Sequence, residues 1–257
     1  MTGLADVLGL AESALAAWLL VFLRVGAAMA LLPAFGEQSV PIRVRLGLTF
    51  CFAAIVAPAT GPDVAASLDR GLPMLQAAVT EIAAGLALGV GHRLMVHTLQ
   101  IAGTMAANMM SLSHLLGGAG ADPQPAIAQI LVLGGLALAA LLGLHVKIAL
   151  AFIASYEVLP PGLVLSAGDF AGWATARVAD AFALAFVLAA PFTIAALLNN
   201  VALGAINRAM PQLMVAFVGA PATVWSALAL LALAAPTILT IWSKALDRLL
   251  AAPFGLP

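Results

Sequence analysis

Long stretches without a charged residue dominate this chain. Four of them contain no Asp, Glu, Lys or Arg: Leu94–Ala121, Pro123–Val146, Ala181–Asn207 and Ala209–Ser243. Each is longer than the run of about 20 apolar residues that a helix needs to cross a bilayer core. The pattern predicts an all-α fold, a polytopic hydrophobic membrane protein in which residues 1–257 form a single unit.

Six hydrophobic helices are predicted along the chain. We expect them at residues 13–35, 44–61, 72–92, 126–150, 179–204 and 211–242. Between the third and the fourth, the chain begins helically through His97–Ala107, and an irregular segment rich in glycine is predicted over residues 108–120. Irregular backbone at membrane depth must be buried in protein or line a watery cavity, since lipid cannot satisfy its amides and carbonyls. The charges in the loops conflict with one another, so they leave the membrane topology open.

Composition agrees with this picture and excludes several classes of protein. The chain is 64% hydrophobic and 8% charged, whereas a soluble domain is about a quarter charged. Basic residues do not exceed acidic ones, so no nucleic-acid partner is expected. Cys51 is the only cysteine and lies in an apolar run, where we expect a small buried side chain. No catalytic motif is found, and we predict neither an enzyme nor a cofactor or metal site.

A few ionisable residues interrupt the apolar runs. An ionisable side chain at membrane depth costs at least about 2.5 kcal/mol, so it usually has a partner or a function. We predict that Arg24 in the first helix pairs with Glu81 in the third. A pair that fixes helix packing is favoured over a proton relay. Gly85 and Gly89 give the third helix a small-xxx-small step, which lets backbones approach closely.

Methionines gather just before the irregular segment. Met105, Met109 and Met110 precede Ser111, Ser113 and the glycines that follow. Methionine is flexible and polarizable, so it fits irregular gaps and re-forms contacts around varied shapes. The group is either gap-filling in a core or a deformable seal in a conduit, and composition does not choose between them.

Two motifs resemble the FliR family of flagellar biosynthetic proteins. The first runs from Leu32 to Leu48 and the second from Asn207 to Leu213, and Asp122-Pro123 occupies a matching place between them. The residues that carry the resemblance are Pro33, Phe35, Pro41, Arg43, Arg45, Gly47, Asp122, Pro123, Asn207, Arg208, Pro211 and Gln212. The chain departs from the family at Gly103-Thr104 and at Gly143-Leu144-His145.

The resemblance implies a core subunit of the flagellar type III protein export gate. Such a subunit has a FliP-like part followed by a FliQ-like helical hairpin, here around Asn199–Ala235. The implied partners are FliP-like and FliQ-like membrane subunits, an FlhB-like subunit, unfolded export substrates and membrane lipids. The implied location is the bacterial inner membrane at the flagellar basal body.

The resemblance also implies a pore plug. The family places a plugging loop where this chain has Met109–Gly120. The candidate plug or seal residues are Met105, Met109, Met110, Ser111, Ser113, His114, Gly117, Gly118 and Gly120.

Two other functions stay open at this point. One is the homologous export-gate subunit of a virulence injectisome, which would share the mechanism and differ in cargo. The other is a small-molecule secondary transporter, which would need paired inverted halves and binding groups near the midplane. No convincing internal repeat is visible in the sequence, which speaks against the transporter.

Overall fold

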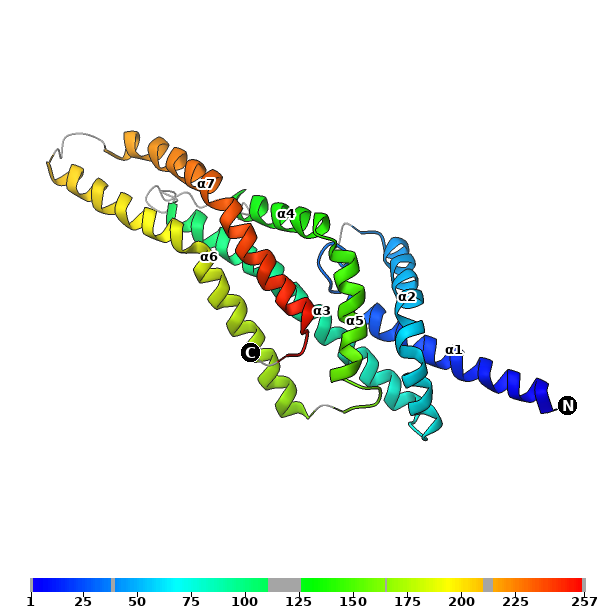
Figure 1. Cartoon of the computed structure of the whole chain (residues 1–257). Coiled ribbons are helices and arrows are strands. Elements are labelled where there is room, and N and C mark those ends of the chain that lie inside the picture. The colour runs from blue at the N-terminus through cyan, green and yellow to red at the C-terminus, as the bar shows by residue number, and fades with distance from the viewer. Residues whose placement is uncertain (1, 38–39, 111–125, 165, 210–214, 256–257) are drawn as a thin grey trace. The chain divides into compact units, whose positions relative to one another are not determined.

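The computed structural model describes residues 2–37, 40–110, 126–164, 166–209 and 215–255. Within these ranges every regular element is a helix (Figure 1). The seven helices are α1 (Thr2–Met29), α2 (Ile42–Asp69), α3 (Met74–Met110), α4 (Ala126–Leu141), α5 (Leu144–Val158), α6 (Ala167–Ala209) and α7 (Val215–Ala251). The prediction of a polytopic all-α protein is therefore confirmed.

Five of these helices are long and apolar enough to cross a membrane. They are the segments Ala11–Met29, Ile42–Asp69, Met74–Met109, Ala167–Ile206 and Trp225–Ala251. The number rises to six if the bent pair α4 and α5 counts as one span. Most of the predicted helices are shorter than those of the structure, because the prediction ends a helix at a charged residue. A helix that has left the apolar layer can continue through charged residues.

The prediction of one helix over residues 126–150 was wrong. The chain bends by 76° between α4 and α5, and Gly143 at the bend has φ 77°. Left-handed backbone of this kind ends helices and favours glycine, which has no Cβ to clash. Hydropathy missed the break because Leu142, Gly143 and Leu144 are all uncharged.

Two further bounds differ from the prediction. The first helix ends at Met29 and not at residue 35, because Pro33 disfavours helical backbone at the residue before it. The third helix continues to Met110, so residues 108–110 are helical and not irregular as predicted. Its expected end at His92 was wrong because His92 is buried in the helix, with Nδ1 2.6 Å from the carbonyl oxygen of Leu88.

The chain divides into two compact units. The first comprises Met1–Leu94, Ala140–Arg177 and Ala245–Pro257. Aromatic contacts hold its helices together: Trp18 of α1 lies 5.0 Å from Phe50 of α2, and Phe52 of α2 lies 6.2 Å from Phe152 of α5, between ring centroids. An ion pair of 2.7 Å between Lys147 and Asp247 joins α5 to the end of α7.

The second unit comprises Met95–Ala139 and Val178–Lys244. Its largest buried side chain is Trp242, whose Nε1 donates to the carbonyl oxygen of Met95 at 2.7 Å. Small residues allow close helix contacts here. A Cβ on Gly103 of α3 would overlap the backbone of Ala128 in α4. Ala196 of α6 and Ala227 of α7 form a small buried cluster.

The prediction that Cys51 is buried was wrong. Its side chain is exposed on α2, next to the exposed Phe50. In a membrane protein both the core and the lipid-facing surface are apolar, so an apolar run does not reveal which way a side chain points.

Candidate functional site

Four polar side chains meet in the interior of the first unit. Arg24 comes from α1, Glu81 from α3, and Ser155 and Tyr156 from α5. Arg24 Nε donates to Glu81 Oε2 at 2.6 Å, and Nη2 donates to Glu81 Oε1 at 2.9 Å. The structure therefore brings together the two residues that the sequence analysis paired, in the two-pronged geometry that gives the strongest charge-assisted hydrogen bonds.

Further contacts surround this pair. Arg24 Nη1 donates to Ser155 Oγ at 3.0 Å, and Nη2 also donates to the carbonyl oxygen of Leu159 at 2.8 Å. The Tyr156 hydroxyl donates to Glu81 Oε2 at 2.9 Å. The guanidinium carbon lies 3.6 Å from the centre of the Tyr156 ring, a cation–π arrangement. One arginine thus joins three helices and the chain that follows α5.

Glycines on α3 allow the helices to approach closely enough for these bonds. A Cβ on Gly85 would overlap the carbonyl oxygen of Arg24, and one on Gly89 would lie 2.9 Å from that of Ala28. The small-xxx-small step of α3 therefore packs against α1 one turn beyond Glu81. This contact sets the separation of the two helices at the depth where Arg24 must reach across.

The pair is almost completely shielded. Arg24 is 1% exposed and Glu81 is 0% exposed. Removing two charges from water is costly, and the cost is met only when both are well paired and hydrogen-bonded. Such an arrangement can fix the packing of helices. In the described residues no three His, Cys, Asp or Glu side chains gather as a metal site would require.

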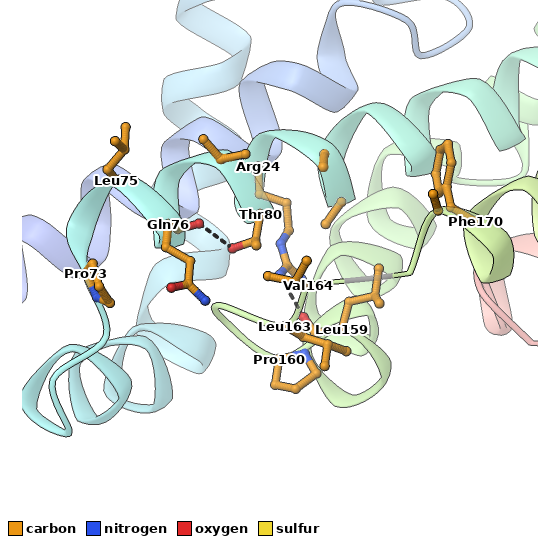
Figure 2. Close-up of a pocket in the computed structure, with 14 residues that line it drawn as sticks. Arg24, Pro73, Leu75, Gln76, Thr80, Leu159, Pro160, Leu163, Val164 and Phe170 are labelled. Atoms are coloured by element: carbon orange, nitrogen blue, oxygen red, sulfur yellow. Dashed lines mark hydrogen bonds between the residues drawn. The ribbon is translucent and has the colours of Figure 1, made fainter.

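An apolar groove of about 610 Å³ lies beside Arg24. Figure 2 shows the start of α3, with Gln76 and Thr80, facing the segment that carries Leu159, Pro160, Leu163 and Val164. The residues that line it are Arg24, Pro73, Leu75, Gln76, Val79, Thr80, Ala83, Ala84, Leu159, Pro160, Leu163, Val164, Ala167 and Phe170. The sequence analysis did not predict this groove.

The first resemblance motif forms the connection between α1 and α2. Pro33 is buried, and the ring of Phe35 lies 5.9 Å from that of Phe52. Arg45 Nη2 donates to the carbonyl oxygen of Glu37 at 3.0 Å. The Glu37 carboxylate in turn pairs with Arg93 of α3 at 3.5 Å. The remaining motif residues Pro41, Arg43 and Gly47 are exposed.

The second motif and the plug segment are described only in part. Asn207 and Arg208 lie in the last turn of α6, and Arg208 is exposed. Met105 and Met109 lie on α3, where Met105 is half-buried and Met109 is 49% exposed, and Met110 is the last residue of that helix. The other predicted residues lie outside the described residues: Ser111, Ser113, His114, Gly117, Gly118, Gly120, Asp122, Pro123, Pro211 and Gln212.

Sequence reasoning missed the partners on α5. Ser155 and Tyr156 complete the cluster around Arg24 and Glu81. One signal was available, because Tyr156 is the only tyrosine in the chain and a buried tyrosine hydroxyl usually has a hydrogen-bond partner. The Leu159 carbonyl carried no such signal, since a backbone acceptor is the same at every residue.

Comparison with known proteins assigns the family. Residues 15–249 match the family described as bacterial export proteins, family 1. The flagellar biosynthetic protein FliR of Caulobacter vibrioides is 32% identical over 236 residues, which cover 90% of this chain and 93% of that protein. The FliR protein of Escherichia coli is 30% identical, with 84% and 83% covered, and that of Bacillus subtilis is 28% identical, with 80% of each covered. The chain, with its helices tied together by Arg24, therefore belongs to family 1 of the bacterial export proteins.

Proposed function

We propose that this chain is a subunit of the flagellar type III protein export gate. The observation that carries the proposal is its similarity, over 80–90% of its length, to proteins named flagellar biosynthetic protein FliR. The chain acts in the bacterial inner membrane at the flagellar basal body. It forms, with FliP-like and FliQ-like subunits and an FlhB-like subunit, the conduit through which unfolded flagellar proteins leave the cytoplasm.

The surface of the helices supports an assembled state. On α6 many large apolar side chains are about 60% exposed in the isolated chain: Phe186, Val187, Ile194, Leu197, Leu198 and Val201. Such a surface needs lipid or protein against it, since large exposed apolar patches mark interaction sites. We propose that residues 1–257 act as one unit, in which the α6–α7 region corresponds to the FliQ-like hairpin.

Loss of the chain is expected to abolish flagellar export. A strain without it should make no filament, should not swim, and should retain filament protein in the cell. The measurement is an immunoblot of filament protein in cells and culture medium, beside swimming in soft agar. A strain that regains the intact chain is the control. Normal swimming without the chain would contradict the proposal. A strain that swims normally but no longer secretes virulence proteins would indicate an injectisome subunit.

Co-purification tests the partners separately. The tagged chain, extracted in mild detergent, is expected to carry FliP-like and FliQ-like subunits at fixed ratios through size-exclusion chromatography. A chain that purifies alone, stable and monodisperse, would contradict the proposed assembly.

We propose further that the segment from Met105 to Gly120 seals the conduit. Flexible methionines followed by glycines and small polar residues suit a seal that must deform and re-form. Deleting residues 113–120 is expected to make the assembled gate leak small ions, seen as growth inhibition or as dye release from vesicles that contain the complex. The control is the undeleted complex at equal abundance. A deleted gate that stays closed to ions would contradict the sealing role.

A further inference from the structure

The chain continues beyond α7 in a short tail that lies against the start of α6. The helix α7 ends at Ala251, and Phe254 of the tail packs on Trp173 of α6, with 5.7 Å between ring centroids (Figure 1). Trp173 also stacks on Phe170 of the same helix, at 5.8 Å. Its six-membered ring covers Gly91 of α3, where a Cβ would lie 3.7 Å from Cζ2 of the indole. The tail therefore presses on the contact between α6 and α3.

Apolar contact holds the tail in this position. Pro253 is buried and Phe254 is half-buried. The backbone hydrogen bonds of the described tail are local, because the amide of Ala252 donates to the carbonyl oxygen of Arg248 and the amide of Gly255 to that of Ala252, both at 3.1 Å. The end of α7 has a separate anchor in its ion pair with α5. The tail can therefore detach from α6 while α7 stays in place.

The closed position of the tail leaves one polar group without a partner. The indole N–H of Trp173 is shielded from solvent and has no hydrogen-bond acceptor among the described residues. A shielded N–H without an acceptor is costly, and this cost is similar in size to the gain from an additional aromatic contact. Water is near at this level of α6, because Asp169, one turn before Trp173, is exposed. The closed and open positions of the tail therefore differ little in free energy.

We propose that the tail is a strap that opens and closes on Trp173 while the helices of the first unit stay folded. When the strap is closed, Phe254 holds the start of α6 against α3. When it is open, Trp173 Nε1 donates to water and the first turns of α6 are free to shift along α3. The strap is a property of this chain and does not rest on the proposed export function.

Cleavage by chymotrypsin reports the open strap. The protease cleaves after an aromatic side chain that enters its specificity pocket, and Phe254 can enter it only after leaving Trp173. The full chain carries its tag at the N-terminus and is extracted in mild detergent with the proteins that accompany it. Intact-mass spectrometry follows the loss of residues 255–257 with time. We expect cleavage at a rate set by the open fraction, at least about tenfold below that of the denatured chain.

Trp173→Phe distinguishes a strap of balanced energies from a simple packing contact. The substitution keeps an aromatic ring and removes the N–H that the closed position leaves without an acceptor. We therefore expect cleavage to slow about fivefold or more, whereas a simple packing contact would weaken with the smaller ring. Trp173→Ala removes the ring and should speed cleavage about tenfold. Trp225→Phe, at a tryptophan of α7 that is 74% exposed, is the matched control and should leave the rate unchanged.

Three results would overturn the proposal. One is cleavage after Phe254 that is as fast in the folded chain as in the denatured chain, because the tail would then not close. The second is a folded chain that keeps residues 255–257 through a digestion that removes them completely from the denatured chain, because the tail would then not open. The third is cleavage of Trp173→Phe that is as fast as that of the unaltered chain or faster, because the unpartnered N–H would then not favour opening.

Discussion

Replacing Glu81 by alanine should destabilise the chain more than any other single change to its polar interior. The substitution leaves the Arg24 guanidinium buried at 1% exposure without its carboxylate. Removing one partner of a buried ion pair costs about 3–5 kcal/mol, which lowers the ratio of folded to unfolded chain at least about a hundredfold. The expected results are low abundance in the membrane, rapid proteolysis and loss of the purified complex. Immunoblotting measures the abundance and the proteolysis, and thermal unfolding measures the stability of any complex that is recovered.

Glu157→Ala is the matched control for this experiment. Glu157 is an exposed glutamate next to Tyr156, and a surface substitution of this kind changes stability by no more than about 0.5 kcal/mol. The exchanged pair, Arg24→Glu with Glu81→Arg, should restore part of the loss. Restoration stays incomplete because a carboxylate at position 24 cannot donate a hydrogen bond to the Leu159 carbonyl oxygen, as Arg24 does. An exchanged pair that is no better than either single variant would remove the idea that the two side chains stabilise one another.

Gly85→Ala should be the most damaging of the glycine substitutions on α3. Its new methyl group would overlap the carbonyl oxygen of Arg24 and lie 2.9 Å from the Cβ of Ala27. Neither the carbonyl oxygen nor the Cβ atom can rotate away, so α1 and α3 must separate, and the Arg24–Glu81 bonds lengthen with them. Overpacking costs about 1–3 kcal/mol, and the weakened ion pair adds to this. The expected result is a lower unfolding temperature of the purified complex.

The same substitution elsewhere provides the control. Gly172 of α6 has nothing within 4 Å of its Cβ position, and alanine is favoured over glycine inside a helix by about 0.8–1 kcal/mol. Gly172→Ala should therefore be neutral or slightly stabilising, whereas Gly85→Ala is destabilising. Equal unfolding temperatures for Gly85→Ala and the unaltered chain would show that α1 and α3 do not pack this closely.

Hydropathy predicted which parts of the chain are helical but not where the helices turn. The break at Gly143 depends on a backbone angle, and no periodicity of apolar residues encodes it within an uncharged run. The length of α3 was wrong because the prediction ended the third helix at His92, before the charged Arg93. In the structure His92 is buried and Arg93 pairs with Glu37, so both residues belong to the helix.

The cost of burying charge identified half of the central cluster. Arg24 and Glu81 had to have partners, and each was the most suitable partner for the other. Ser155, Tyr156 and the Leu159 carbonyl carry no charge, so no comparable penalty pointed to them. The groove could not be predicted either, because its walls come from segments some eighty residues apart and are lined by side chains that also suit a lipid-facing surface.

The outward-facing thiol of Cys51 gives this protein a built-in reporter. Because it is the only cysteine in the sequence, a maleimide reagent attaches at a single known point on α2. Water-soluble and membrane-permeant reagents, applied to intact cells, would then distinguish whether that stretch of helix meets solvent, bilayer or a neighbouring subunit. No engineered residue is needed for this measurement of topology.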